Sequence, residues 1–223
     1  ILARALEIPA VVAVTGFLSG VRDGDEVVLD GSSGDVYVNP DEETKKLFTG
    51  RQSRFMEEKK ELEKYIGRPS VTKDGVRVEI VANIGKPEDV EKVLQYDGEG
   101  IGLFRTEFLF MDREAMPTED EQFEAYKKVA EAMDGKPVII RTLDIGGDKE
   151  IPYMGLEKDE NPFLGYRAIR FCLARKEDIY KPQLRALLRA SAYGNIRIMV
   201  PLVTCIEEYR QALEFFKKNK GKL

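Results

Sequence analysis

From about residue 67 onward, apolar runs of strand length alternate with amphipathic stretches of helix length. The four expected strands are "VRVEIVANI", "GIGLF", "PVIIRT" and "IRIMVPLV", and a predicted helix follows each of them. Nearly continuous apolar strands are typical of sheets that are buried on both faces. Strands that alternate with helices in this way build a parallel sheet covered by helices. The sequence therefore predicts an α/β fold from residue 67.

Repeated βα units form either an open, doubly wound sheet or a closed (β/α)8 barrel. We favour the barrel, because no GxGxxG turn follows a strand and because polar side chains gather where the strands end. A complete barrel takes about 250 residues, whereas residues 67–223 supply only four units. We therefore expect the first half of a (β/α)8 barrel, as part of a longer protein.

The residues before position 67 do not show this alternation of strand and helix patterns. Residues 1–40 contain short apolar runs and a hairpin pattern, "RDGDEVVLDGSSGDVYVN", and are too few to bury a core of their own. In residues 41–66, Phe48, Phe55 and Leu62 recur every seven residues among charged side chains. This spacing predicts one amphipathic helix that connects two domains, with a partner-binding coiled coil as the alternative.

Composition narrows the function classes. The 223 residues carry a formal net charge of −5, which argues against non-specific nucleic-acid binding. No apolar run is long enough to span a bilayer, so we expect a cytoplasmic protein without membrane insertion. The chain has no histidine, which excludes a Ser-His-Asp triad or a Cys-His dyad within it. Cys172 and Cys205 belong to no metal-binding motif, and we interpret both as buried thiols.

Two of the predicted strands end on the same dipeptide, Arg-Thr. Arg105 and Arg141 each follow a short apolar run, and the carboxyl ends of barrel strands form the active-site face. A guanidinium group stays protonated and binds carboxylate or phosphate through two hydrogen bonds. The pair therefore suits a small, multiply charged anion such as a phosphorylated carboxylic acid. The alternative is that each arginine forms a surface ion pair, for example with Glu107 or Asp144.

A long loop, "TLDIGGDKEIPYMGLEKDENPFLGYRAIR", follows the third strand. Loops of this length in compact domains are usually functional. Gly146 and Gly147 allow close approach of the backbone to a ligand, and the loop ends with Arg167 and Arg170. The Walker A spacing is absent. The alternative is a flexible surface loop, and the ordered pattern of "ENPFLGYRAIR" argues against it. We interpret this loop as functional.

Three stretches, "GIGLFRTEFLFMDR", "VIIRTLDIGGDK" and "ENPFLGYRAIR", make the chain similar to the Enzyme I family of the bacterial sugar phosphotransferase system, the phosphoenolpyruvate-protein phosphotransferases. The N-terminal "ILARALEIPAVV" also resembles that family. The resemblance covers essentially the whole chain. It implies that residues 1–40 end a swivelling phosphohistidine domain, that 41–66 form a linker helix, and that 67–223 form part of the phosphoenolpyruvate-binding (β/α)8 barrel.

The resemblance also implies a function. The family passes the phosphoryl group of phosphoenolpyruvate to its own histidine and then to the carrier protein HPr, which drives sugar uptake. Arg105 and Arg141 match the arginines that bind phosphoenolpyruvate, and Arg167 matches a third catalytic arginine. The family uses Mg²⁺ and forms homodimers. Its histidine would precede Ile1, and its metal ligands would lie on later strands, so we expect this chain alone to be inactive.

Three alternatives stay open. Pyruvate phosphate dikinase and phosphoenolpyruvate synthase share the "RTE" strand end, although their counterpart of "RTLDIGGDK" differs. A non-catalytic phosphoenolpyruvate-binding module is the alternative outside the enzymes. A metal-dependent aldolase barrel fits the alternation of strands and helices, but the paired arginines beside "DIGGDK" argue against it.

Overall fold

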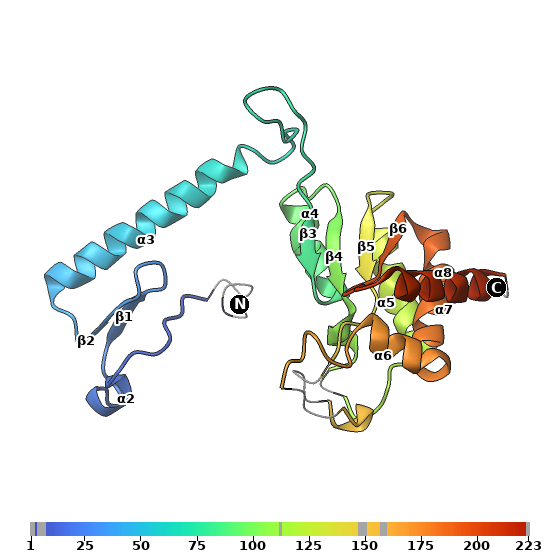
Figure 1. Ribbon diagram of the computed structural model, residues 1–223. Helices are drawn as coiled ribbons and strands as arrows, with labels where there is room; N and C mark the ends of the chain where they lie inside the picture. The colour runs from blue at the N-terminus through green and yellow to red at the C-terminus, as the bar shows by residue number, and fades with distance from the viewer. Residues whose placement is uncertain (1–2, 4–7, 112, 147–150, 157–159, 222–223) are drawn as a thin grey trace. The chain divides into compact units, whose positions relative to one another are not determined.

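A computed structural model describes residues 3, 8–111, 113–146, 151–156 and 160–221. The chain divides into two compact units, Ile1–Ile66 and Gly67–Leu223 (Figure 1). Within the described residues, no helix is long and apolar enough to cross a membrane.

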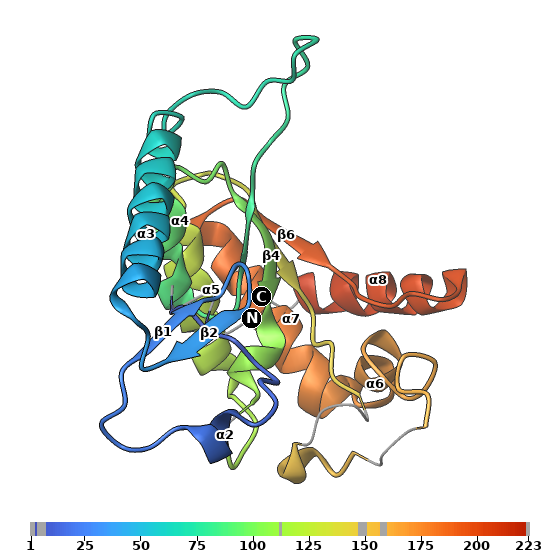
Figure 2. The same ribbon diagram turned by 90° about the vertical axis from the view of Figure 1, so that its left-hand side faces the viewer.

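The first unit contains a β-hairpin and one long helix. Its elements are α2 (Phe17–Gly20), β1 (Val27–Asp30), β2 (Asp35–Val38) and α3 (Glu42–Glu63). The two strands pair antiparallel, as their alternating pattern predicted. Asp41 caps the long helix by accepting a hydrogen bond from the backbone N–H of Thr44 at 2.8 Å. The hairpin therefore leads directly into α3 (Figure 2).

Helix α3 buries little of its apolar stripe. Phe48 is buried and packs edge-on against Tyr37 of β2, with 5.6 Å between the ring centroids. Phe55 and Leu62, one and two heptads further along, are 59% and 66% exposed. The hairpin covers only the beginning of the helix, so the heptad spacing predicted the helix but not the burial of its stripe.

The second unit is built on four parallel strands in the order β3-β4-β5-β6. The strands are β3 (Ala82–Ile84), β4 (Ile101–Arg105), β5 (Val138–Arg141) and β6 (Ile196–Met199). The longer helices are α4 (Val90–Gln95), α5 (Glu119–Ala132), α6 (Ile169–Ala174), α7 (Lys181–Ala190) and α8 (Ile206–Lys220). Short helical turns cover Pro87–Asp89, Thr106–Leu109, Pro152–Met154, Lys176–Tyr180 and Ser191–Tyr193.

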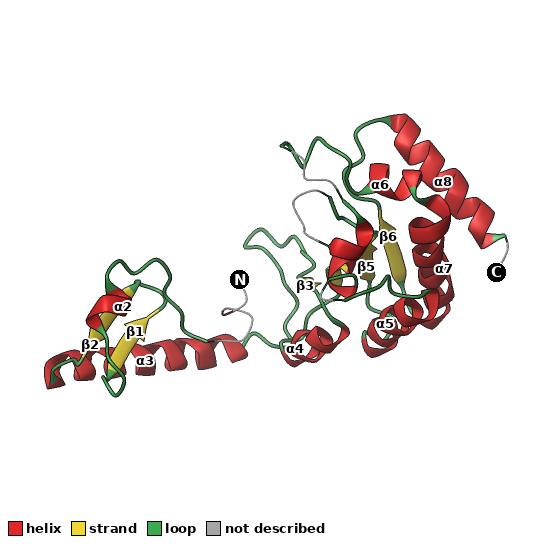
Figure 3. Cartoon of the chain, turned by 90° about the horizontal axis from the view of Figure 1, so that it is seen from below, coloured by secondary structure: helices red, strands yellow, loops and turns green. Residues whose placement is uncertain are grey.

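Consecutive strands lie side by side, and α4, α5, α7 and α8 lie along one side of them (Figure 3). This arrangement confirms the predicted fold class, because a doubly wound sheet would place helices on both faces. The first strand is shorter than its pattern predicted. Val76, Val78 and Ile80 are exposed and precede β3, which begins only at Ala82. Only the last three residues of "VRVEIVANI" pair with β4.

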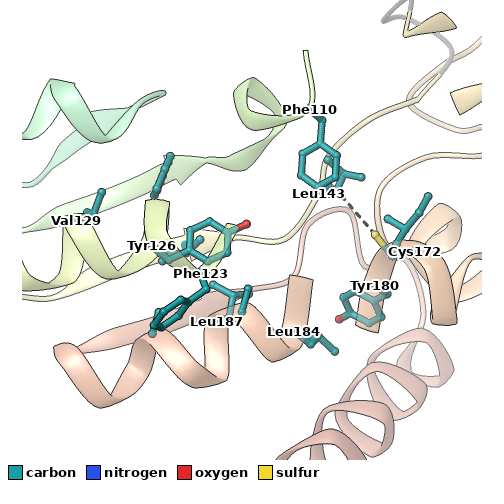
Figure 4. Packing of buried hydrophobic residues seen from close by; sticks show 14 of the residues in the cluster. Phe110, Phe123, Tyr126, Val129, Leu143, Cys172, Tyr180, Leu184 and Leu187 are labelled. Atoms are coloured by element: carbon teal, nitrogen blue, oxygen red, sulfur yellow. Dashed lines mark hydrogen bonds between the residues drawn. The ribbon is translucent and has the colours of Figure 1, made fainter. Parts of the chain in front are cut away.

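The core lies between the sheet and the helices. Phe104 of β4 is fully buried and meets Tyr126 of α5 edge-to-face, with 5.9 Å between ring centroids. Figure 4 shows Tyr126 beside Leu187 of α7. Side chains alternate along a strand, so the neighbours of Phe104 and of the buried Ile140 point to the opposite face of the sheet. Those neighbours include the two strand-end arginines.

The two cysteines differ in environment. Cys172 is buried, and its Sγ lies 3.8 Å from the carbonyl oxygen of Leu143 (Figure 4). Burial, reinforced by the charge of Asp144, raises the pKa of the Cys172 thiol to about 12. The prediction of a second buried thiol was wrong, because Cys205 is exposed. It occupies the N-cap position of α8, where the chain turns from the sheet into the helix.

We expect iodoacetamide at pH 8 to alkylate Cys205 in the native chain and to leave Cys172 unmodified. The thiolate is the reactive form, and Cys172 is both inaccessible and protonated at this pH. Peptide mass spectrometry after timed quenching measures both sites. Denaturation in urea is the control and should make both thiols reactive. Equal modification of the two cysteines in the native chain would contradict the structure.

Candidate functional site

Arg105 and Arg141 stand next to each other at the carboxyl ends of β4 and β5. They are direct partners in the parallel register. Partners in register project to the same face of a sheet, and neighbouring strands are about 4.8 Å apart. The structure thus brings together the two arginines that the sequence singled out. They lie on the face opposite the one on which Phe104 packs against α5.

Arg141 forms two ion pairs. Its Nη2 lies 2.6 Å from Oε1 of Glu107, and its Nη1 lies 3.1 Å from Oδ2 of Asp144. All three side chains are largely shielded from solvent, with exposed fractions of 18%, 5% and 8%. The alternative interpretation named these same carboxylates as ion-pair partners. The pairs are formed by Arg141, but they are shielded rather than at the surface, where they would contribute little.

Arg167 joins the same cluster from the far end of the long loop. Its Nε donates to Oδ1 of Asp144 at 2.7 Å, so this carboxylate bridges two guanidinium groups. Its guanidinium carbon lies 4.6 Å from the ring centroid of Phe163. Among the described residues, this cluster contains the three arginines and two carboxylates, so the cluster carries a net positive charge.

Gly146 makes the position of Arg167 possible. A β-carbon on Gly146 would lie 2.8 Å from both Cβ and Cγ of Arg167, too close for any larger residue. The carbonyl of Ile145 also accepts a hydrogen bond from the N–H of Ala168 at 3.1 Å. Residues 144–146 are therefore packed directly on the arginine. Gly147, the second predicted glycine, lies outside the described residues.

Arg105 differs from the other two arginines. Within the described part of the chain it makes no ion pair, and its guanidinium carbon lies 5.3 Å from the ring centroid of Phe108. The Nε atoms of Arg105 and Arg141 are buried and have no hydrogen-bond acceptor there. A buried donor without an acceptor is costly. Two such donors on neighbouring strand ends indicate a site for an anion with several oxygen atoms.

Across the described ranges, no group of three or more His, Cys, Asp and Glu side chains could hold a metal ion. The two carboxylates of the cluster, Glu107 and Asp144, are engaged by arginines. The Mg²⁺ expected from the resemblance thus finds no fitting ligand set among these residues.

Family models match nearly the whole chain. The "PEP-utilising enzyme, PEP-binding domain" model matches residues 59–223, and the "PEP-utilising enzyme, mobile domain" model matches residues 1–34. The chain belongs to the family of PEP-utilising enzymes. The residues that match the PEP-binding domain include Arg105, Arg141 and Arg167.

Several curated relatives are similar to the chain over its whole length. The chain is 54% identical to the phosphoenolpyruvate-protein phosphotransferase of Staphylococcus epidermidis, 53% identical to that of Staphylococcus aureus and 52% identical to that of Bacillus subtilis. Each match covers all of this chain and 39% of the relative. The chain therefore spans about two-fifths of the length of these relatives. These matches confirm the resemblance that the three motifs indicated.

Sequence reasoning missed two features of the site. It treated Glu107 and Asp144 as competitors of the anion, although Asp144 links Arg141 to Arg167. It also overlooked Phe108, which stacks under Arg105. The "FRTEF" spacing could have suggested this contact, since an aromatic ring three residues beyond an arginine on a tight turn can reach its guanidinium.

Proposed function

We propose that the chain is part of a phosphoenolpyruvate-protein phosphotransferase and that Arg105 and Arg141 bind phosphoenolpyruvate. The observation that carries this proposal is the pair of in-register arginines whose buried Nε donors have no acceptor among the described residues. Phosphoenolpyruvate is a phosphorylated carboxylic acid, so it presents two anionic groups to two guanidinium groups. The names of the relatives and the PEP-binding family model support the choice of ligand.

In this proposal the arginines act electrostatically. Arg105 has no carboxylate partner in the described residues and remains available for the ligand. Arg141 is held in place by Glu107 and Asp144. Positive charge held in place beforehand stabilises the charge that develops on phosphoryl oxygens during transfer. Arg167 adds to this field through the shared carboxylate of Asp144.

The remaining parts of the proposal rest on the resemblance. The 223 residues include no histidine, so the proposal places the phosphoryl-accepting histidine outside them, and HPr is the next acceptor. Residues 1–40 would belong to the phosphohistidine domain, 41–66 to the linker helix and 67–223 to the barrel. The whole protein would be a cytoplasmic homodimer that uses Mg²⁺ and serves sugar uptake. The ligands of this Mg²⁺ would lie outside the residues that the structure describes.

Isothermal titration of phosphoenolpyruvate into the chain at low ionic strength tests the proposal. We expect Arg105→Ala to weaken binding by about 10- to 100-fold, since a hydrogen bond to a charged group contributes about 1.5–3 kcal/mol. Circular dichroism should show an unchanged fold.

Arg197→Ala is the matched control. Arg197 is exposed on β6 and pairs in register with Ile139, two residues before Arg141, so it lies on the same face but nearer the start of the strands. This variant should bind as the wild type does. A chain that does not bind phosphoenolpyruvate would refute the proposal. Weak binding that Arg105→Ala leaves unchanged would instead favour a non-catalytic module.

A further inference from the structure

Gln183 is a fully buried amide in the helix layer behind the arginines. It lies on α7, and its side chain makes three hydrogen bonds. Its Oε1 accepts from the backbone N–H of Leu143 at 2.9 Å. Its Nε2 donates to Thr106 Oγ1 and to the Tyr126 hydroxyl, each at 3.2 Å. All hydrogen-bonding positions expected of a buried amide are thus used except one acceptor lone pair.

The direction of every hydrogen bond in this network follows from one fact. The N–H of Leu143 can only donate, so the amide oxygen of Gln183 must face it and the amide nitrogen must face the two hydroxyls. Each hydroxyl accepts from Gln183 and is then free to donate onward. Thr106 donates to the carbonyl oxygen of Arg141 at 2.7 Å, and Tyr126 donates to Gln122 at 3.2 Å. Burial raises the pKa of Tyr126, so its hydroxyl keeps the proton that it donates.

The network ends on both arginine-bearing strands. Thr106 directly follows Arg105, and the carbonyl that it contacts belongs to Arg141. Leu143 lies two residues beyond Arg141. One side chain of α7 therefore links the residues that directly follow the ends of β4 and β5. An apolar residue could fill the same volume, but it would leave the N–H of Leu143 buried without an acceptor.

We propose that Gln183 is a positioning residue that sets the spacing of Arg105 and Arg141 for a ligand with two anionic groups. The inference rests on the proposed function, since it concerns the same pair of arginines. If Gln183 sets this spacing, its side chain should affect affinity most for ligands that bind both guanidinium groups at once. A ligand that needs only one of them, such as inorganic phosphate, depends far less on their spacing.

The test compares the affinities of phosphoenolpyruvate and inorganic phosphate in variants of the full chain, by titration calorimetry. Gln183→Met keeps the length of the side chain without its donors, and Thr106→Val keeps the shape without the hydroxyl. We expect each to weaken phosphoenolpyruvate binding about tenfold and to change phosphate binding less than about twofold. Thr106→Ser, which restores the hydroxyl, should recover most of the affinity for phosphoenolpyruvate.

Val129→Ala controls for loss of stability alone. Val129 is fully buried on α5 and takes no part in the hydrogen-bond network, so this variant should lose stability and bind both ligands as the wild type does. Thermal unfolding monitored by circular dichroism sets a temperature at which all variants are folded. If Gln183→Met does not fold, Thr106→Val and Thr106→Ser carry the same comparison.

The outcomes separate the inference from the proposed function. A wild-type chain that does not bind phosphoenolpyruvate refutes the proposed function and the inference with it. A second possible result is that Arg105→Ala weakens phosphoenolpyruvate binding while folded Gln183→Met and Thr106→Val leave it unchanged. That result would overturn the inference and leave the proposed function standing. An equal loss in Val129→Ala, or a parallel loss of phosphate binding, would also overturn it, because the effect would then be one of general stability.

Discussion

Replacing Arg141 with alanine is expected to lower the free energy of unfolding by about 3–5 kcal/mol, besides abolishing the proposed binding of phosphoenolpyruvate. Glu107 and Asp144 are 5% and 8% exposed and both pair with this guanidinium. Arg141→Ala removes a positive partner from both shielded carboxylates, although Asp144 keeps its pair with Arg167. Removing one partner of a shielded ion pair costs far more than the pair contributes to stability. Urea unfolding followed by circular dichroism measures the change.

Arg105→Ala is the matched comparison, because it removes the same group from the partner position of the neighbouring strand. Arg105 makes no ion pair within the described residues, so its loss should change stability by less than about 1 kcal/mol. The double variant Arg141→Ala/Glu107→Gln should recover part of the loss, because it neutralises Glu107 while Asp144 still pairs with Arg167. Equal stability of the Arg105 and Arg141 variants would show that the ion pairs do not hold the strand end.

The second large effect is expected from Phe104→Ala, with a loss of about 3–5 kcal/mol. Phe104 is fully buried, and its ring meets Tyr126 edge-to-face at 5.9 Å between centroids. Truncation removes this contact and leaves a cavity between β4 and α5 that the packed sheet cannot close. The midpoint and slope of the urea unfolding curve measure the effect.

Phe108→Ala serves as the control for the loss of an aromatic ring in the same segment. Phe108 is 40% exposed and contacts the guanidinium of Arg105 rather than the core. Its removal should lower the free energy of unfolding by about 1 kcal/mol or less. It should instead weaken the binding of phosphoenolpyruvate, because Phe108 contacts Arg105. A stability loss as large as that of Phe104→Ala would contradict the placement of Phe108 outside the core.

The pattern of apolar runs was sufficient to predict the α/β class and the existence of β4, β5 and β6. These strands are short and almost wholly apolar, so few other structures could bury them. The same pattern overestimated the first strand. Val76 and Val78 have high strand propensity, but their backbones bond to Thr72 and Ser70 in an isolated bridge rather than to β4. Pairing with β4 begins only at Ala82, and pairing decides where a strand begins.

The candidate site was only partly predictable. Arg105 and Arg141 could be placed at strand ends because an apolar run stops there. Their pairing with Glu107 and Asp144 could be named only as one possibility, since the sequence does not tell which way a side chain turns. The exposure of Cys205 was missed for a related reason, because a residue at a helix start borders both core and solvent.

The sequence alone determined the class of fold, the family and the identity of the charged groups, because these depend on local composition and on motifs that do not change with folding. The tertiary structure decided which residues of these motifs contact one another. Register placed Arg105 beside Arg141, and packing of α7 brought Gln183 to Thr106, 77 positions away along the chain. Such contacts arise from the pairing of strands and the docking of helices, and no local pattern specifies them.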